Sequence, residues 1–534
     1  MPRYLKTSAA LLATALAVTG CGGAGPDQNE ASGVSEVALP SPGEGCTADR
    51  AGGTITMGEY TMLPSFAPGQ GAYGVVGGSQ SAAVYDRLMR WDAQGEEFVP
   101  QLAESLESDD TSTRWTLTLP EGVEFSNGDP LTASDVAFTV GLHQDPATRS
   151  MGMADARQVA DVEVVDDQTV EFVLSEPWAG FPSMLTGPVG EVIPQQAFEA
   201  ASPEEWAAAP IGAGAYLLDE YIPGQTAVMK PNPNYYGGEV CTTLEFVRVP
   251  GSQGTFEAFQ TGELQVGFLR GAKIVHDAMD ADLPGFYAVL SSGSIINLNN
   301  GAGGYDGVFT DVRARQAVAH ALDRELMDQR LSGGVGQPTA ALLSEDSRFY
   351  SGQEGPAFDP ERSSALVEEV KQDTGWDGGV TLVIGDGPEN VESGVVIKAL
   401  LDAVGFDVTI ENTAVSQVTA RQFTGDYEMM IGGSVVTEAD PAHSLWSAVV
   451  PGGAMNFTGT DDERLVKAVT ELKATTDAEE LTDRLAEFQE LHDEVVPYTV
   501  HANAEEYVIV AESVHGLAPT LHNVILFDDA YVQD

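Results

Sequence analysis

Three short apolar segments separated by helical stretches constrain the fold of this chain most strongly. Residues 381–384, 407–410 and 428–431 are typical of strands, and residues 394–404 are typical of a helix. Such a β-α-β rhythm joins parallel strands through helical crossovers. The second half of the chain is therefore predicted to contain a mainly parallel sheet.

The length of the chain requires more than one lobe. Its 534 residues, 43% of them hydrophobic, exceed the roughly 250 to 300 residues at which a single core stops growing. In the first half, residues 53–58, 115–119 and 169–174 are predicted strands. Residues 131–142 are a predicted helix, with Thr132 and Asp135 in a variant of the capping box.

Further helices are expected in the second half. Residues 360–372 form one helix and residues 461–496 form a helical pair. A single helix is predicted over residues 311–331, with these residues on one face: Val312, Ala317, Ala321, Leu322 and Leu326.

The first twenty residues resemble a secretory signal peptide. Arg3 and Lys6 precede an apolar run at residues 9–18. This run has about half of the ~20 residues that a membrane-spanning helix needs. Residues 1–20 are therefore predicted to be removed rather than to span a membrane.

The segment around Cys21 indicates a lipid anchor. Residues 18–21, Val-Thr-Gly-Cys, resemble a bacterial lipobox, in which the cysteine thiol receives a diacylglyceryl group and becomes the mature N-terminus. The alternative is an ordinary signal peptide that is cleaved nearby. Residues 21–49 are rich in small and acidic residues, so they are predicted to form a flexible tether.

The charge of the chain is strongly negative. There are 25 basic and 81 acidic residues, which gives a net charge of −56. Loss of Arg3 and Lys6 with the signal peptide would lower it to −58. Such a body repels nucleic acid and anionic lipid headgroups, so no nucleic acid partner is expected. A high-salt habitat and a compositional bias of the source both remain open as explanations.

No catalytic motif is recognisable in the sequence. The patterns G-x-S-x-G, H-E-x-x-H and the Walker loop do not occur, and residues 69–74 fit G-x-G-x-x-G only in a loop flanked by prolines. Cys46 and Cys241, the cysteines other than Cys21, are too few for a C-x-x-C metal site. Accordingly, no catalytic residue, metal site or cofactor is predicted.

Several segments resemble the family 5 extracellular solute-binding proteins of ABC importers, which include peptide, nickel and opine binders. The strongest are residues 84–88 (VYDRL), 100–106 (PQLAESL) and 122–136 (GVEFSNGDPLTASDV). Further matches follow in the order of the family: 210–216, 232–238, 312–324, 358–361, 425–428 and 440–441. The resemblance covers about residues 50–534.

This resemblance implies an α/β fold of the periplasmic-binding-protein-like type II, with two lobes, a hinge and a subdomain inserted in the first lobe. The expected bounds are 50–80, 205–292 and 501–534 for the first lobe, 81–204 for the subdomain, and 293–500 for the second lobe. The family places the segments that follow Cys46 and Cys241 in the same lobe, and disulfides persist outside the cell. The two cysteines are therefore predicted to pair.

The resemblance also implies that the ligand lies between the lobes. The candidate ligand-binding residues are Tyr60, Thr61, Met62, Asn297, Asn299, Phe349, Gly433, Ser434, Thr437, Glu438, Asp440 and Trp446. Structural roles remain open for some of them. Met62 and Phe349 suit a core, the two asparagines suit turns, and Asp440 before Pro441 suits a helix cap.

One of these positions bears on the ligand. Peptide binders that this chain resembles hold the peptide ammonium with an aspartate three residues before the Asp-Pro pair, where this chain has Thr437. A hydroxyl cannot replace that charge, although Glu438 is the next residue. Simple di- and tripeptides are therefore not expected as the main ligands. An oligopeptide, another organic solute and a metal chelate remain open.

The predicted function is that of a monomeric lipoprotein on the outer face of the cytoplasmic membrane. It would capture a small-molecule solute by hinge closure and deliver it to ABC permease and ATPase subunits. A surface receptor or sensor that is not coupled to import and a secreted enzyme are the alternatives. Adjacent permease and ATPase genes, or loss of uptake on deletion, would distinguish the importer from the receptor.

Overall fold

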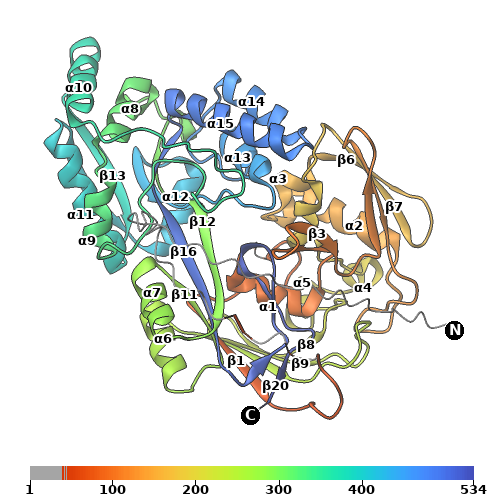
Figure 1. Ribbon diagram of the computed structural model, residues 1–534. Coiled ribbons are helices and arrows are strands. Elements are labelled where there is room, and N and C mark those ends of the chain that lie inside the picture. The colour runs from red at the N-terminus through yellow and green to blue at the C-terminus, as the bar shows by residue number, and fades with distance from the viewer. Residues whose placement is uncertain (1–38, 41–42, 44, 72, 534) are drawn as a thin grey trace, which may run out of the picture. The chain divides into compact units, whose positions relative to one another are not determined.

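A mixed β-sheet of ten strands organises the described part of the chain (Figure 1). The computed structural model describes residues 39–40, 43, 45–71 and 73–533. In spatial order the strands are β14 (Asp407–Thr413), β13 (Gly379–Gly385), β15 (Met429–Gly432), β12 (Gly285–Leu298), β16 (Tyr498–Val510), β11 (Val266–Arg270), β1 (Thr54–Glu59), β10 (Thr243–Arg248), β9 (Thr226–Pro231) and β8 (Tyr216–Ile222).

Two groups of parallel strands lie in this sheet. The first block consists of β10, β1 and β11, and the second block consists of β14, β13 and β15. The second block uses α11 (Pro388–Ala403) and α12 (Val415–Thr424) as its crossovers. The predicted β-α-β arrangement and the α/β fold are therefore confirmed.

Two long antiparallel strands, β12 and β16, join the two blocks (Figure 1). They have 14 and 13 residues, and their pairing shifts register around Ser294. Beside this irregularity, a Cβ atom on Gly293 would overlap the backbone of Ala504. Glycine therefore permits the close approach of the two strands where the register changes.

A separate antiparallel sheet of four strands lies between β1 and β8 in the sequence. Its order is β4 (Ser105–Ser108), β5 (Arg114–Thr118), β7 (Thr169–Leu174) and β6 (Val159–Val164). Helix α2 (Ala133–Gln144) follows the predicted capping box, because the backbone N–H of Thr132 donates to Oδ2 of Asp135 at 3.0 Å. We call residues 86–192 the four-stranded subdomain.

The remaining elements cover these sheets or connect them. The other helices are α1 (Val75–Tyr85), α3 (Met153–Ala156), α4 (Gln195–Ala200), α5 (Pro203–Ala208), α6 (Ser252–Gln260), α7 (Ala272–Asp280), α8 (Val312–Ala321), α9 (Arg324–Leu331), α10 (Pro360–Thr374), α13 (Pro441–Val449), α14 (Glu463–Lys473) and α15 (Ala478–Val495). Three short antiparallel pairs in the described chain join β2 (Met89–Asp92) with β3 (Glu97–Pro100), β17 (Val514–His515) with β20 (Tyr531–Val532), and β18 (Ala518–Pro519) with β19 (Ile525–Leu526). Among the described residues, no helix has the length and apolar content needed to cross a bilayer.

The prediction of one helix over residues 311–331 is wrong. The chain forms α8 and α9, which are separated at Leu322 and Asp323. The Asp323 side chain accepts a hydrogen bond from the backbone N–H of Leu326 at 3.0 Å, so it starts a new helix. Val312 and Leu326, which were predicted to share the buried face, are 37% and 40% exposed.

The buried apolar side chains form several clusters. One lies on the first block and includes Ile55, Phe246 and Phe268. A second lies within the four-stranded subdomain and reaches from Leu88 to Val192, with Ala213 added. Two more lie on the second block and beneath α13, α14 and α15. Each group of elements therefore has an apolar core of its own.

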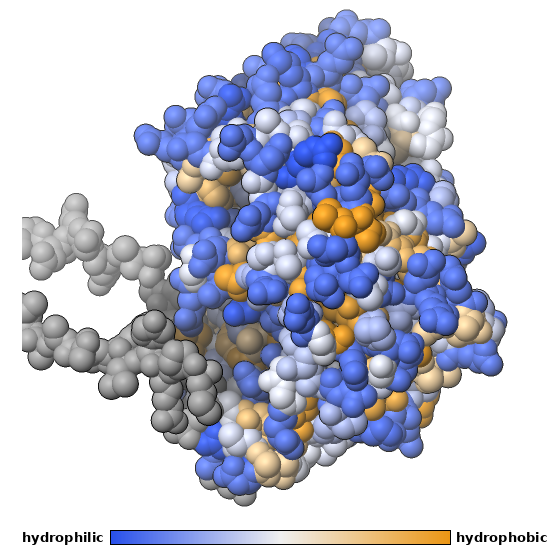
Figure 2. All heavy atoms as spheres, turned by 90° about the vertical axis from the view of Figure 1, so that its right-hand side faces the viewer, coloured by the Kyte–Doolittle hydropathy of each residue, from blue (hydrophilic) through white to orange (hydrophobic). Residues whose placement is uncertain are grey.

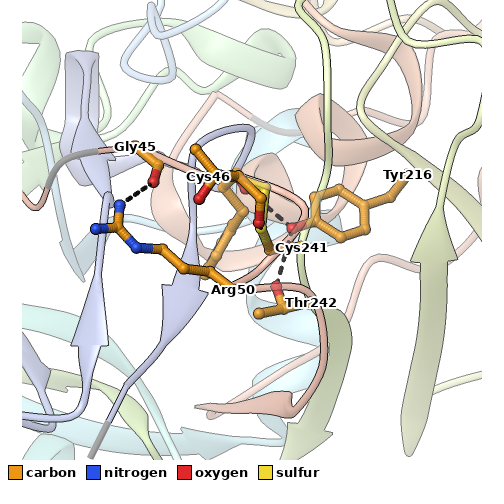
Figure 3. Close-up of a disulfide and its surroundings, with 8 residues drawn as sticks. Gly45, Cys46, Arg50, Tyr216, Cys241 and Thr242 are labelled. Carbon is orange, nitrogen blue, oxygen red and sulfur yellow. Dashed lines mark hydrogen bonds between the residues drawn. A yellow bond between two sulfur atoms is a disulfide. The ribbon is translucent and has the colours of Figure 1, made fainter.

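The first residues of the described chain are tied to β10 by a disulfide (Figure 3). Cys46 and Cys241 are bonded with an S–S distance of 2.04 Å. Nearby, the backbone N–H of Gly52 donates to the carbonyl of Cys241 at 2.7 Å. Tyr216 Oη lies 3.2 Å from Oγ1 of Thr242 and donates to the carbonyl of Phe527 at 2.9 Å. The disulfide thus lies where the two ends of the described chain meet β8 and β10. Cys21 and the signal peptide lie outside the described residues.

The surface beside the four-stranded subdomain is mainly hydrophilic. Figure 2 shows hydrophobic residues on this face only in small patches between hydrophilic ones. This pattern agrees with a chain that has 81 acidic residues.

Candidate functional site

The carboxyl ends of the two parallel blocks come close together. Strand β11 of the first block ends at Arg270, and β15 of the second block ends just before Gly433. Nη2 of Arg270 lies 3.8 Å from the position that a Cβ atom would take on Gly433. In open α/β sheets, ligands bind at the carboxyl ends of parallel strands. This junction is therefore the candidate site.

The loop after β1 contributes two exposed residues to this edge. Tyr60 is 39% exposed, and its ring centroid lies 5.9 Å from that of Phe268 on β11. Thr61 is also exposed. Nε of Arg248, the last residue of β10, donates to the carbonyl of Tyr60 at 3.3 Å. Met62, by contrast, is buried in the core of the first block. This agrees with the alternative that Met62 is a core residue rather than a ligand-binding residue.

A buried acid lies directly before this loop. Gln80 Nε2 and the backbone N–H of Gly77 donate to Oε2 of Glu59 at 2.6 and 3.2 Å. Burial raises the pKa of Glu59 to about 8, although both hydrogen bonds act to lower it. Glu59 Oε1 and Gln80 Oε1 have no hydrogen-bond partner in the described part of the chain. With a pKa of about 8, the Glu59 carboxyl is largely protonated at neutral pH.

The two predicted asparagines of the crossover differ. Asn297 is 2% exposed, and its Nδ2 has no partner among the described residues. A Cβ atom on Gly432 would overlap that nitrogen, so glycine makes room for it. Asn299 is fully buried, and its Nδ2 donates to the carbonyls of Tyr427 and Gly425 at 2.8 and 3.0 Å. Asn299 therefore holds the turn after β12.

The residues before α13 are engaged in starting that helix. Asp440 Oδ1 accepts from the backbone N–H of His443 at 2.9 Å. Thr437 Oγ1 accepts from the backbone N–H of Asp440 at 3.2 Å and lies 3.2 Å from Oγ of Ser444. The structural alternative for Asp440, a helix cap before a proline, agrees with these contacts.

Glu438 and Phe349 lie around Arg348. Oε2 of Glu438 is 3.9 Å from Nε of Arg348, and burial raises the pKa of the Glu438 carboxyl. The Arg348 guanidinium lies 4.6 Å from the centroid of Phe349, which is 4% exposed. Nη1 of Arg348 also donates to Oε2 of Glu96 in the subdomain at 3.3 Å. This arginine therefore connects the segment before α13 to the subdomain.

A second group of contacts joins the subdomain to the segments around α13 and α14. We call it the Trp178 cluster, and its members are Asp155, Trp178, Ser183, Asp440, His443, Trp446 and Lys473. Oδ2 of Asp440 accepts from Trp178 Nε1 at 2.9 Å and from Ser183 Oγ at 3.1 Å. A Cβ atom on Gly180 would overlap this carboxylate, so glycine permits the approach.

Aromatic and charged groups complete the Trp178 cluster. His443 Nε2 lies 2.9 Å from Oδ1 of Asp155, and its ring stacks on that of Trp178 at 4.4 Å. Nζ of Lys473 lies 4.3 Å from the ring centroids of both Trp178 and Trp446. Burial lowers the pKa of Lys473 to about 8. Two of the predicted ligand residues, Asp440 and Trp446, therefore take part in contacts within the protein.

Sequence reasoning missed Arg270 and Glu506. Arg270 on β11 is exposed and lies directly opposite Glu506 on β16. Glu506 is 8% exposed, and burial raises the pKa of its carboxyl to about 7 while Arg270 acts to lower it. The signal in the sequence is an acidic pair, residues 505–506, directly before the apolar end of β16 at residues 507–510. Only the strand register reveals its arginine.

A cavity of about 310 Å³ lies elsewhere, on the second block. Its lining includes Tyr305, Thr381, Glu411 and Arg421. Nη1 of Arg421 pairs with Oε1 of Glu411 at 2.6 Å. None of the predicted ligand residues lines it. In the described part of the chain, no group of three or more His, Cys, Asp or Glu side chains could hold a metal ion.

Comparison with known proteins gives consistent results. A family model described as "Bacterial extracellular solute-binding proteins, family 5 Middle" matches residues 97–456. A putative ABC transporter peptide-binding protein of Brucella abortus is 26% identical over 300 residues, and the alignment covers 55% of each chain. This chain thus spans about half the length of that relative. The nickel-binding periplasmic protein of Escherichia coli is 26% identical over 442 residues, which cover 77% of this chain and 82% of that protein.

A solved structure shows the same fold. The oligopeptide-binding protein AppA from Bacillus subtilis, in complex with a nonapeptide, has a TM-score of 0.77 at 18% identity. The comparison covers 91% of this chain and 100% of that chain. The predicted α/β fold of the periplasmic-binding-protein-like type II is therefore confirmed.

Proposed function

Since the chain belongs to the family 5 bacterial extracellular solute-binding proteins of ABC importers, we propose that it captures a small solute between two lobes and delivers it to a membrane permease. The family consists of substrate-binding proteins rather than enzymes. The solute, the membrane anchor and the partner subunits belong to the proposal.

One observation carries the proposed site: the carboxyl ends of the two parallel blocks meet at Arg270 and Gly433. In the sheet that the structure describes, β12 and β16 lie between the two blocks and connect them. A ligand at this junction would touch both blocks, and it would therefore stabilise the arrangement in which they are close.

We assign the lobes with the bounds expected from the resemblance. The first lobe comprises residues 50–80, 205–292 and 501–534, the inserted subdomain comprises 81–204, and the second lobe comprises 293–500. β12 and β16 cross from one lobe to the other, so the irregular pairing around Ser294 is the proposed hinge. The Trp178 cluster then holds the subdomain against the second lobe and stabilises the closed form.

The proposed anchor is a lipid on Cys21. Residues 21–49 would act as a tether between the outer face of the cytoplasmic membrane and the folded body. The partners would be ABC permease and ATPase subunits, and the protein would act as a monomer. A Cys21→Ala variant should lose its partition into the detergent phase, whereas the parent chain should keep it.

The solute class follows from position 437. Relatives are named for peptides and for nickel, and Thr437 is occupied by the start of α13. A hydroxyl there does not compensate a peptide ammonium. We therefore propose that simple di- and tripeptides are not the main ligands, and that the solute is a longer peptide, another organic solute or a metal chelate.

Thermal shift and uptake measurements test this function. A solute at 100 times its Kd should stabilise the protein by about 2.7 kcal/mol, which a melting experiment detects. Amino acids, peptides, sugars, opines and metal chelates form the screening panel. At least one should raise the melting temperature, and deletion of the gene should abolish uptake of that compound. A binder whose uptake is unchanged in the deletion strain would favour a surface receptor instead.

A further inference from the structure

We propose that Arg270 and Glu506 bind the two charges of one α-amino-carboxylate head group, so that the solute is an amino-acid-type zwitterion. The inference rests on the proposed function, because it names the solute class of the same site. Arg270 would receive the carboxylate, and Glu506 would receive the ammonium group.

Arg270 is available to a ligand. Its backbone N–H is fixed by Ser252 Oγ at 2.9 Å at the end of β11. Its side chain is exposed and makes no hydrogen bond or ion pair with any residue that the structure describes. Nη2 points towards the second block and lies 3.8 Å from the Cβ position of Gly433. A guanidinium in this position can donate two parallel hydrogen bonds to a carboxylate at the junction.

Glu506 is buried without a hydrogen-bond donor from the described residues. It is 8% exposed, and its carboxylate accepts no hydrogen bond from the described residues. Glu505, on the opposite face of β16, is by contrast bound by Tyr287 Oη at 2.6 Å and lies 3.0 Å from His276 Nε2. A buried carboxylate without donors is costly unless a cation or a proton joins it. Burial accordingly raises the pKa of Glu506 to about 7.

The two side chains lie on the same face of the sheet. Arg270 and Glu506 are directly opposite each other in the antiparallel register of β11 and β16, and such pairs share a face. Phe268, two residues before Arg270, lies on that face with Tyr60 above it. The two charged side chains therefore lie next to the aromatic pair of Phe268 and Tyr60.

Their spacing favours an amino-acid head over the two ends of a peptide. Opposite residues in an antiparallel pair have Cα atoms about 5 Å apart. The ammonium and carboxylate of an α-amino acid are joined through a single carbon, so they can reach neighbouring side chains together. The termini of an extended tripeptide are separated by about 7 Å or more, since each residue spans up to ~3.5 Å. Secondary amines flanked by carboxylates, as in opines, satisfy the same spacing.

The test uses the full-length protein and three sets of probes. The first set contains free L-amino acids and N-carboxyalkyl amino acids. The second contains the N-acetyl and C-amide derivatives of each compound that binds, and the third contains di-, tri- and hexapeptides. Binding is measured by thermal shift and by isothermal titration calorimetry. We expect a compound of the first set to bind, and both of its blocked derivatives to bind at least tenfold more weakly.

Variants assign the effect to the two residues. Arg270→Gln and Glu506→Gln should each weaken binding of that compound at least tenfold. Arg330→Gln and Glu512→Gln replace exposed charges elsewhere and should leave the Kd unchanged. Circular dichroism and the melting temperature without ligand show whether each variant is folded. If Glu506→Gln does not fold, Glu506→Asp serves instead, and a Kd unchanged by it and by Arg270→Gln contradicts the inference.

The outcomes separate this inference from the proposed function. Binding of peptides or other solutes without any amino-acid-type compound overturns the inference and leaves the function standing. Binding of an amino acid that Arg270→Gln and Glu506→Gln do not weaken also overturns the inference. Absence of binding by every probe, together with unchanged solute uptake in a deletion strain, overturns the proposed function itself.

Discussion

Two of the places where the halves of the molecule come together differ in how their charges are satisfied. In the Trp178 cluster, both oxygens of Asp440 accept hydrogen bonds, and Asp155 binds Tyr73 Oη at 2.8 Å as well as His443. At the junction of the parallel blocks, Arg270 and Glu506 lie opposite each other in the strand register, and neither forms an ion pair with another described residue. The carboxylates of the first place are satisfied within the protein, whereas the charges of the second place are those that we propose a solute compensates.

We infer that the Trp178 cluster stabilises closure and that the junction recognises the ligand. A group whose hydrogen bonds are all made can stabilise closure, but it has no capacity left to recognise a ligand. An unpaired buried charge destabilises the empty protein. A ligand that compensates this charge therefore gains binding free energy. Closure and recognition should therefore respond to different substitutions.

The disulfide provides a reference that belongs to neither place. Its two cysteines are separated by 195 residues, and closing a loop of this length stabilises a protein by about 5 kcal/mol in the chain-entropy model. The double variant Cys46→Ala, Cys241→Ala should unfold at a much lower denaturant concentration, while the Kd for the solute stays within about twofold. If the variant is fully folded but binds the solute much more weakly, then the disulfide contributes to solute binding as well as to stability.

Glu59 tests whether a buried acid beside the junction is neutralised by protonation rather than by a charged partner. Its folded-state pKa of about 8 lies above the ordinary value of 4.5. The unfolded chain therefore releases this proton first, so the contribution to stability falls between about pH 4.5 and pH 8 and is then constant.

Glu59→Gln removes this dependence. Relative to the parent protein, the variant should gain on the order of 4 kcal/mol in unfolding free energy at pH 8 and almost nothing at pH 4.5. Urea denaturation at both pH values gives the difference, and Glu512→Gln at an exposed position is the control. An equal change at the two pH values would contradict a raised pKa.

Asp440 tests the complete contact against a simple helix cap. Asp440→Ala removes the cap of α13 and leaves Trp178 Nε1 and Ser183 Oγ without their acceptor, so it should cost about 3 kcal/mol. Asp359 is the matched control, because it also precedes a proline and caps α10 through Arg362 N–H at 2.9 Å. Asp359→Ala should cost about 1 kcal/mol. Equal losses in chemical denaturation would mean that the contacts to the subdomain contribute nothing.

The sequence predicts local structure well and long-range contacts poorly. The structure confirms three predictions that depend on neighbouring residues. They are the alternation of strands and helices in the second block, the limits of β7 and the Thr132 capping box. The break between α8 and α9 was missed, because apolar spacing continues through Leu322 while the Asp323 cap overrides it. Family motifs extended the prediction to the type II fold.

The candidate site shows the same limit. The resemblance pointed to Tyr60 and Gly433, which do lie at the junction. It could not show that Asp440 reaches Trp178, 262 residues away, or that Arg270 faces Glu506. Neither pairing leaves a periodic signal in the chain, since each depends on the register of strands and on the approach of separate elements.

Salt should have the smallest effect, because it stabilises the empty protein, leaves the Trp178 cluster intact and weakens solute binding at the junction. The excess of acidic residues repels itself, and the screening length falls from about 10 Å at 0.1 M salt to about 3 Å at 1 M. The melting temperature of the empty protein should therefore rise with salt. The Trp178 cluster keeps its contacts, because the side chains of His443 and Asp155 are only 14% and 12% exposed.

Arg270 is exposed, so salt should weaken its attraction for a carboxylate, and the Kd should rise by less than tenfold. In Arg270→Gln this salt dependence of the Kd should largely disappear, while the rise in melting temperature remains. A flat melting temperature would contradict the role given to overall repulsion, and an affinity loss that persists in Arg270→Gln would contradict the role given to the junction charges.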